Sequence, residues 1–310
     1  MLSLPGSESV WISAVIGVLL LGIFYYKSPK FRYNVKFAIY IFQMSSVAAF
    51  MIPFSIFRPK DVRNIHFGIP LMKLLGRFLG IRWEISGKEI LKKDFPCVVI
   101  SNHQSMLDAM AIVELWPTMY KCACIAKKEI LYVFPFGLMC WLCGTIFIDR
   151  KNPGQSQMKM STSAEQIIAN KTKIWIFPEG TRSKQENLKP FKKGAFHIAL
   201  MHKLPIVPIV ISPYQFIDDE KKIFGTGTVK AKILDPIDTS NLVYPDDVSN
   251  LAERCHELMN LEFQRLKEEM QTLASSKALP ALNTRSKGAN GHTNSMGDDN
   301  GIAFDGKSIS

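Results

Sequence analysis

No Lys or Arg occurs among the first 26 residues, so the chain lacks the basic stretch that opens a secretory signal peptide. It also lacks the Gly-x-Ser-x-Gly motif that carries the nucleophile of many serine hydrolases, and we exclude a hydrolase of that type. Acidic residues are in the minority, because 27 Asp and Glu face 38 Lys and Arg and leave a net charge of +11. This excess of positive charge favours anionic partners.

The six cysteines do not form the spaced framework of a small disulfide-linked secreted domain. Cys122, Cys124, Cys140 and Cys143 could in principle supply four thiolates to a zinc ion. The last two lie in the apolar stretch FGLMCWLCG, however, where a free cysteine behaves as a small hydrophobic residue. We therefore expect no metal site.

Two apolar runs near the N-terminus indicate a membrane protein. Residues 10–26 carry no charge and end in Tyr25 and Tyr26, and Lys27 follows them; all three are residue types that favour the membrane interface. We predict an N-terminal transmembrane anchor over residues 1–26. Basic residues follow this run but do not precede it, which places the N-terminus in the lumen and the following residues in the cytosol. A lipid bilayer is the expected partner, in preference to nucleic acid.

Residues 27–80 are predicted to form a second hydrophobic and amphipathic membrane segment. Its uncharged run, 37–57, is interrupted by Pro53 and polar residues and has cations at both ends, so the charge rule cannot orient it. A full span would return the rest of the chain to the lumen, whereas a re-entrant or interfacial helix pair would leave it in the cytosol. We favour the second arrangement because residues 65–81 continue as a cationic amphipathic segment suited to the bilayer surface.

A tag placed after Ser310 is expected to be digested when protease is added to sealed microsomes, because the favoured arrangement leaves the C-terminus in the cytosol. Immunoblotting for the tag measures this, with detergent-opened microsomes as the control for complete digestion. A tag that is protected until detergent is added would contradict the favoured arrangement.

Beyond residue 81, strand-like runs alternate with helical stretches, a pattern typical of an α/β fold with a largely buried sheet. Helices are expected at 156–170, 194–201 and 246–272, and strands at 97–100, 145–148, 173–177, 204–211 and 228–234.

The run at 130–148 is apolar enough to resemble a membrane span, but Pro135, Gly137 and Gly144 break it. We predict that it forms core and membrane-facing surface of a globular domain over residues 81–274. The remaining residues, 275–310, have the polar composition of a disordered tail.

The apolar strand at 97–100 stops abruptly on polar residues. Helical spacing resumes from Ser105, so residues 102–105 form a strand-to-helix corner. On one continuous helix His103 and Asp108 would lie about 140° apart, so they can meet only if His103 lies in the corner. A carboxylate bound to one imidazole nitrogen leaves the other as a base for an alcohol proton. The same corner is also typical of an ordinary helix N-terminus with a solvated histidine.

A second polar group, FPEGTRS, follows the predicted strand at 173–177. Gly180 would let backbone amides approach a phosphate, and Arg182 offers a bidentate guanidinium group. Lys127 and Arg150 supply further cations near the ends of predicted elements, although basic residues in loops are mostly solvated surface. These residues together are suited to binding a phosphate group.

In combination, these blocks resemble the glycerolipid acyltransferase family, and more closely its 1-acylglycerol-3-phosphate (lysophosphatidic acid) acyltransferase branch. The family's NHxxxxD block appears as NHQSMLD at 102–108, and its second block as GTIFIDR at 144–150. FPEGTRS lies at 177–183 and VPIVI at 207–211, while the KxEL element reads KKEI, with Ile in place of Leu. The match covers roughly residues 81–270.

The resemblance implies the family's fold, a mixed sheet flanked by helices and preceded by membrane-embedded helices. It also implies that His103 is the general base for the sn-2 hydroxyl of lysophosphatidic acid, and that Asp108 orients its ring. The activated oxygen would attack the thioester of acyl-CoA directly, giving phosphatidic acid and CoA, with Glu179 positioning the loop or the acceptor. The residues implied in substrate binding are Lys127, Arg150, Glu179, Gly180, Thr181 and Arg182.

The resemblance further implies that acyl-CoA is a co-substrate and that no cofactor is needed. By family analogy, the enzyme would lie in the endoplasmic reticulum membrane with its active site facing the cytosol. An acyltransferase for another acceptor, such as glycerol 3-phosphate or a different lysophospholipid, shares these blocks and stays open. A non-catalytic module that binds anionic lipid is the alternative of another class, but it would not need the pair of His103 and Asp108.

Overall fold

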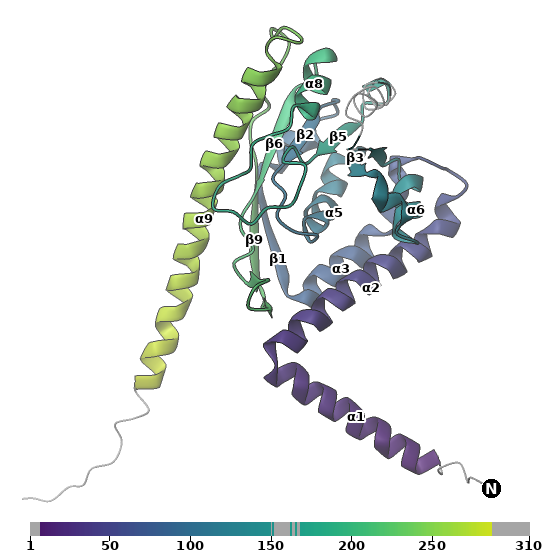
Figure 1. The fold of residues 1–310 in the computed structure, drawn as a ribbon, viewed down its shortest axis with the longest axis vertical. Coiled ribbons are helices and arrows are strands. Elements are labelled where there is room, and N and C mark those ends of the chain that lie inside the picture. Colours follow the sequence, from purple (N-terminus) through teal and green to yellow (C-terminus); the bar gives the residue numbers. More distant parts are fainter. Residues whose placement is uncertain (1–6, 150, 152–161, 163–164, 166–167, 287–310) are drawn as a thin grey trace, which may run out of the picture. The chain divides into compact units, whose positions relative to one another are not determined.

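The computed structural model describes residues 7–149, 151, 162, 165 and 168–286. The chain forms two units, Met1–Met270 and Gln271–Ser310. The first contains a seven-stranded sheet in the order β1-β9-β6-β2-β5-β3-β4 (Figure 1). In chain order these strands are β1 (Ile81–Ser86), β2 (Val98–Ser101), β3 (Cys122–Lys127), β4 (Ile146–Ile148), β5 (Lys173–Ile176), β6 (Ile206–Ile211) and β9 (Gly227–Ile233).

The sheet is mixed, as the family resemblance implied. The five adjacent strands β6, β2, β5, β3 and β4 are parallel to one another. β9 runs antiparallel to β6, and β1 runs parallel to β9. Every residue of β2, β5 and β6 is buried, which explains why these strands have nearly continuous apolar sequences. The carboxyl ends of the five parallel strands lie along one edge of the sheet.

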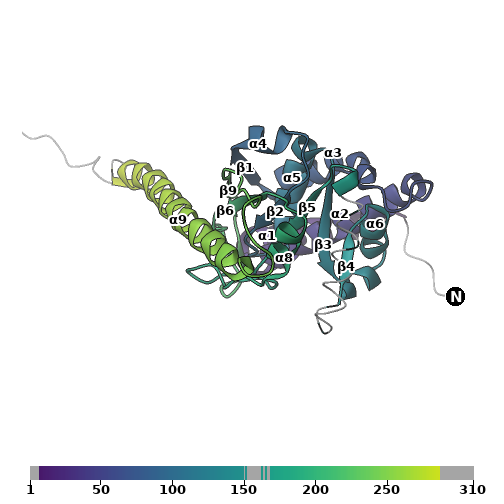
Figure 2. The same cartoon turned by 90° about the horizontal axis from the view of Figure 1, so that it is seen from above.

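Helices cover both faces of the sheet (Figures 1 and 2). Val99 of β2 belongs to the core on one face, whereas its neighbours Val98 and Ile100 belong to the core on the other. The first face carries α2 (Pro29–Ser55), α3 (Ile69–Leu79), α5 (Asp108–Met119) and α6 (Phe136–Leu142). The second face carries α8 (Gly194–Met201) and the first turns of α9 (Val248–Ser286).

Shorter elements connect these layers. The helix α4 (Lys88–Lys92) follows β1, and the hairpin of β7 (Ile217–Asp218) and β8 (Ile223–Phe224) links β6 to β9. Two 3-10 helices, η1 (Val62–Phe67) and η2 (Lys128–Tyr132), precede α3 and α6. The hairpin contacts α2, which brings it close to the N-terminal part of the chain.

The two N-terminal helices are long and apolar enough to cross a membrane. The first, α1 (Ser7–Lys27), exposes its apolar side chains, whereas α2 buries one side against the sheet domain. Lys36, on the buried side of α2, donates hydrogen bonds to the carbonyl oxygens of Leu79 (3.1 Å) and Gly225 (2.8 Å). The second membrane segment is therefore joined to the sheet domain along one face, and its orientation in a bilayer stays a prediction.

Most predicted elements correspond to observed ones. The five predicted strands match β2, β4, β5, β6 and β9, and the helix predicted at 194–201 is α8. The predicted α/β fold is therefore correct, whereas β1 and β3 were missed. Most of the helix predicted at 156–170 lies outside the described residues.

The last helix differs from its prediction. α9 continues to Ser286, beyond the helix end predicted at residue 272 and into the stretch predicted as a disordered tail. Ala and Leu, which are strong helix formers, occur twice each in residues 275–286, at 278–279 and 281–282, on either side of Pro280. Residues 287–310 lie outside the described part of the chain.

Candidate active site

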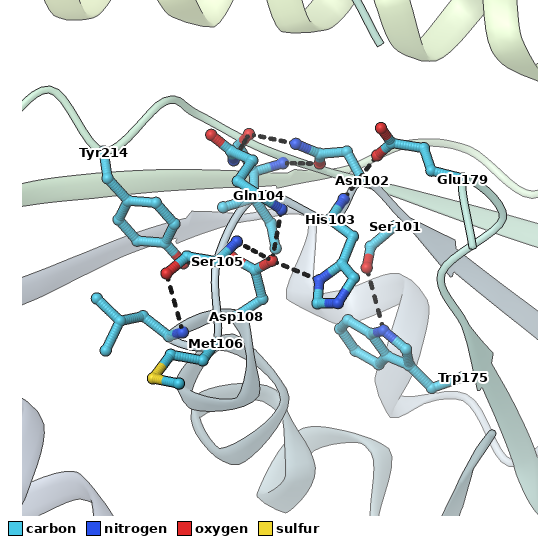
Figure 3. A network of polar contacts seen from close by, with 12 residues as sticks. Ser101, Asn102, His103, Gln104, Ser105, Met106, Asp108, Trp175, Glu179 and Tyr214 are labelled. Atoms are coloured by element: carbon cyan, nitrogen blue, oxygen red, sulfur yellow. Dashed lines mark hydrogen bonds and ion pairs between the residues drawn. The ribbon is translucent and has the colours of Figure 1, made fainter. Parts of the chain in front are cut away.

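The corner between β2 and α5 is tied to the end of β6 by side-chain amides (Figure 3). The Asn102 amide donates to the Ile211 carbonyl oxygen (2.9 Å), and its oxygen accepts from the Ile211 N–H (2.8 Å). Gln104 Nε2 donates to the carbonyl oxygens of Ile211 (3.0 Å) and Ser212 (3.1 Å). These bonds satisfy buried backbone groups where the strand stops and hold the corner in one conformation.

His103 and Asp108 meet in this corner, as their spacing required. The Nδ1 atom of His103 lies 2.7 Å from Oδ2 of Asp108, whose side chain is fully buried. The same Oδ2 accepts from the backbone N–H groups of Gln104 (2.7 Å) and Ser105 (2.9 Å). Oδ1 accepts from the hydroxyl of Tyr214 (2.8 Å). Four donors therefore fix the carboxylate, and the carboxylate fixes the imidazole.

Tyr214 is a member of this site that the sequence analysis missed. It lies shortly after Ile211, the last residue of β6. Burial, together with the negative charge of Asp108, raises the pKa of its phenol well above the ordinary value. The phenol therefore stays protonated and donates to Asp108. Its place beyond the carboxyl end of a strand parallel to β2 was the signal that could have revealed it.

The FPEGTRS loop packs directly against His103. The Phe177 ring stacks on the imidazole with centroids 4.1 Å apart, and the Ser183 N–H donates to the His103 carbonyl oxygen (2.8 Å). Nδ1 faces Asp108, and no described residue forms a hydrogen bond with Nε2. Because the side chain is 20% exposed, Nε2 is the ring nitrogen accessible to a ligand.

Glu179 belongs to this loop and its side chain is buried. Its carboxylate accepts hydrogen bonds from a backbone group in the corner and from another in the chain that follows the loop. Its Oε1 accepts from the His103 N–H (2.7 Å) and its Oε2 from the Lys189 N–H (3.3 Å). Burial raises the pKa of this carboxyl, and the two N–H donors offset part of that increase. In this structure Glu179 joins the loop to the corner, one of the two roles implied for it.

Replacing Glu179 with Gln is expected to flatten the pH dependence of stability. Because its folded pKa is raised, the folded protein holds this proton to higher pH than the unfolded chain does. The free energy of unfolding therefore falls as pH rises from the ordinary value of 4.5 through the folded pKa, and Gln has no such proton to lose.

Denaturant unfolding of detergent-solubilised protein between pH 4.5 and pH 7 measures this slope. Glu220→Gln, at an exposed glutamate of the β7–β8 hairpin, is the matched control. A Glu179→Gln slope equal to that of wild type would contradict the prediction.

Arg182 and Ser183, at the end of the loop, line a cleft of about 500 Å³, and Gly180 and Thr181 form the turn that precedes them. Gly180 has φ of +71°, and a Cβ there would lie 2.8 Å from the Lys192 side chain, so the turn requires glycine. Thr181 Oγ1 accepts a long hydrogen bond from Lys189 (3.5 Å). The cleft is lined by Tyr33, Phe37 and Ile41 of α2, by Gln104, Ser105 and Met106 of the corner, and by Arg182, Ser183, Lys184 and Asp219.

Of the predicted phosphate ligands, Lys127 does not line this cleft. Lys127 is exposed at the end of β3, on the same sheet edge as the corner but two strands away from β2, or about 10 Å. Arg150 lies outside the described residues. Arg182 does line the cleft, and its guanidinium group forms no hydrogen bond or ion pair with a described residue.

The cysteines remain free thiols among the described residues. Burial raises the pKa of Cys97 and of Cys140 to about 12, so both stay protonated at neutral pH. Within the described ranges, no group of three or more His, Cys, Asp and Glu residues is arranged to hold a metal ion.

Comparisons with known proteins place the chain in a family. A family model described as Acyltransferase matches residues 82–212, which include the corner and the FPEGTRS loop. The chain is 39% identical over 249 residues to the human protein named 1-acyl-sn-glycerol-3-phosphate acyltransferase alpha, covering 80% of this chain and 87% of that protein. It is 34% identical to the human beta protein of the same name, covering 84% of this chain and 94% of that protein.

A solved structure also shares the fold. It is the crystal structure of the 1-acyl-sn-glycerophosphate (LPA) acyltransferase PlsC from Thermotoga maritima, with a TM-score of 0.57 and 22% identity. The similarity covers 76% of this chain and 98% of that chain.

Proposed function

This chain belongs to the acyltransferase family, among relatives named 1-acyl-sn-glycerol-3-phosphate acyltransferases, and from that premise we propose its reaction. It transfers the acyl group of acyl-CoA to the sn-2 hydroxyl of 1-acyl-sn-glycerol 3-phosphate, giving phosphatidic acid and CoA. The observation that carries the proposal is the contact of 2.7 Å between His103 Nδ1 and the buried carboxylate of Asp108.

His103 acts as the general base in this reaction. With Nδ1 protonated and donating to Asp108, Nε2 carries the lone pair and removes the proton from the sn-2 hydroxyl. The negative charge of Asp108 stabilises the imidazolium ion that forms. A solvated histidine at a helix N-terminus would need neither this carboxylate nor the three other donors that hold it.

The acyl group passes directly between the two substrates. The hydroxyl oxygen attacks the thioester carbonyl, the tetrahedral intermediate collapses with loss of the CoA thiolate, and the proton held by His103 passes to the sulfur. Each bond formed or broken belongs to a substrate or to this proton, so the reaction needs no enzyme nucleophile and no cofactor.

Arg182 binds the acceptor phosphate at the rim of the cleft. It reaches the cleft beside Gln104 and Ser105, the residues that follow His103. Its planar guanidinium group can donate two parallel hydrogen bonds to a phosphate. Gly180 and Thr181 shape the turn that carries it, Glu179 fastens that turn to the corner, and Lys127 and Arg150 stay predicted ligands of the same phosphate.

The enzyme works at a bilayer, which we place as the endoplasmic reticulum membrane with the active site facing the cytosol. Two N-terminal helices of sufficient length and apolar composition support membrane attachment, and basic residues following α1 support the orientation. A bilayer holds the acyl chains of acceptor and product, while the polyanionic CoA group stays in water.

The acceptor is tested with membrane fractions supplied with labelled oleoyl-CoA and either lysophosphatidate or glycerol 3-phosphate, for wild type and His103→Ala. Phosphatidate formed from lysophosphatidate by wild type alone supports the proposal. Transfer only to glycerol 3-phosphate would show that glycerol 3-phosphate, and not lysophosphatidate, is the acceptor. No transfer to either by folded wild-type protein would contradict the proposed reaction.

A further inference from the structure

The cleft lined by Gln104 and Ser105, the residues that follow His103, holds a second cation that the family motifs do not include. We propose that Lys184 and Arg182 together form a phosphomonoester site, and that Lys184 makes this site selective for lysolipids with a terminal phosphate. This inference rests on the proposed function and names the feature by which the enzyme recognises its acceptor.

Lys184 is held at the cleft by residues from two other parts of the chain. Its Nζ lies 2.6 Å from Oδ2 of Asp219, in the hairpin between β7 and β8. The Tyr33 hydroxyl, on α2, donates to Oδ1 of the same carboxylate (2.9 Å). Tyr33, Lys184 and Asp219 all line the cleft. We call these three residues the rim bridge, because they join α2, the hairpin and the residue that directly follows the FPEGTRS loop.

Asp219 remains ionised in the rim bridge. Burial alone would raise the pKa of its carboxyl, but the hydrogen bonds from Lys184 and Tyr33 prevail and lower it. The turn that carries Asp219 is fixed by its neighbour Asp218, whose Oδ1 accepts from the backbone N–H groups of Glu220 (3.0 Å) and Lys221 (2.9 Å). The lysine therefore has a fixed anionic partner at the cleft before any acceptor arrives.

The ion pair with Asp219 leaves Lys184 able to bind a ligand. A lysine ammonium has three donors, and Asp219 Oδ2 takes one of them. The side chains of Lys184 and Asp219 are 40% and 46% exposed, and a surface ion pair of this kind contributes little to stability. Lys184 can therefore donate to a phosphate while it keeps its contact with Asp219, or lengthens that contact at a small cost in free energy.

A second cation favours a phosphomonoester over a phosphodiester. A terminal phosphate carries about −1.5 to −2 charges near pH 7, whereas a phosphate joined to a further head group carries a single charge. A terminal phosphate also has three free oxygens, so it can accept from Arg182 and Lys184 at the same time. From this polar end, Phe37 and Ile41 continue along α2 and give the acyl chain an apolar path.

Two non-reactive ligands separate these contributions: a lysophosphatidate lacking the sn-2 hydroxyl, and the methyl ester of its phosphate. Both are used as inhibitors of acyl transfer to lysophosphatidate, so no turnover of either is required. In Lys184→Met, the inhibition constant of the phosphomonoester is expected to rise about tenfold or more, the typical effect of losing a charged hydrogen bond. That of the methyl ester should rise less than about threefold, because its phosphate depends less on a second cation.

Three further measurements distinguish ligand binding from a structural role. Lys221→Met removes the same charge from another ion pair, with Asp218, and should change neither constant because Lys221 does not line the cleft. Lys184→Arg keeps the charge and should restore most of the preference for the monoester. In Lys184→Met, the KM for lysophosphatidate should rise by a larger factor than kcat falls, the pattern expected when an interaction that binds the acceptor is lost.

Equal weakening of both inhibitors in Lys184→Met, or weakening of neither, would overturn the inference while leaving the acyltransferase reaction intact. Wild-type protein that transfers no acyl group to lysophosphatidate would instead remove the proposed function on which the inference rests. The two failures are therefore separated within one set of assays.

Discussion

His103→Ala is expected to lower kcat by about 10²- to 10⁴-fold, the usual contribution of a positioned general base. The sn-2 hydroxyl would then have to lose its proton to water, because no other described side chain occupies the position of Nε2. The initial rate of phosphatidate formation from oleoyl-CoA and lysophosphatidate measures the effect. A variant whose rate stays within tenfold of wild type would end the general-base assignment.

The loss of activity should not come from unfolding. Both backbone hydrogen bonds of His103, to Glu179 and from Ser183, survive truncation of the side chain. Only the stacking on Phe177 and the bond to Asp108 are lost. Thermal unfolding in detergent checks this point, and His202→Ala, at the end of α8 and outside the cleft, serves as the histidine control.

Asp108→Asn should lower kcat by about 10²- to 10⁴-fold as well, because an amide cannot stabilise the imidazolium ion by its charge. It should also lower the free energy of unfolding by about 1–3 kcal/mol. Four donors converge on this buried carboxylate, and an amide, with one acceptor oxygen, cannot satisfy all of them.

The double variant His103→Ala/Asp108→Asn tests whether the two residues act as a unit. If Asp108 works through the imidazole, the double variant should be no slower than His103→Ala alone, because the effects of such residues are not additive. Steady-state rates of the two single variants and the double variant provide the comparison. Losses that multiply in the double variant would show that Asp108 acts independently of His103.

Local patterns were enough to predict much of the sheet. The strands β2, β5 and β6 are buried on both faces, so their sequences are continuous apolar runs with clear ends. β1 was missed although its sequence, IRWEIS, alternates apolar and polar residues as a half-buried strand does, because its first residue was assigned to the amphipathic segment at 65–81. β3 was missed because its sequence, CACIAK, holds a single β-branched residue and only Cys122 and Ala123 of its residues are buried, so it lacks the continuous apolar pattern of β2, β5 and β6.

The candidate site shows the same division between local and distant information. The corner placed His103 near Asp108 because both belong to one short segment with a definite geometry. Tyr214 and Asp219 come from parts of the chain whose positions depend on sheet order and on the docking of α2. No local pattern gives the antiparallel placement of β9 or the contact between Tyr33 and the hairpin, so these partners appear only in the folded chain.

The wall of the cleft formed by Tyr33, Phe37 and Ile41 belongs to a helix that is itself a candidate membrane segment. An acceptor would then reach His103 by lateral diffusion within the lipid, and the encounter would occur in two dimensions. The acceptor concentration that sets the rate is then its mole fraction in the membrane, and not its amount per volume of buffer. Adding inert phospholipid at constant total acceptor would slow the reaction by surface dilution, and a chain without α2 would lack both the wall and this route of supply.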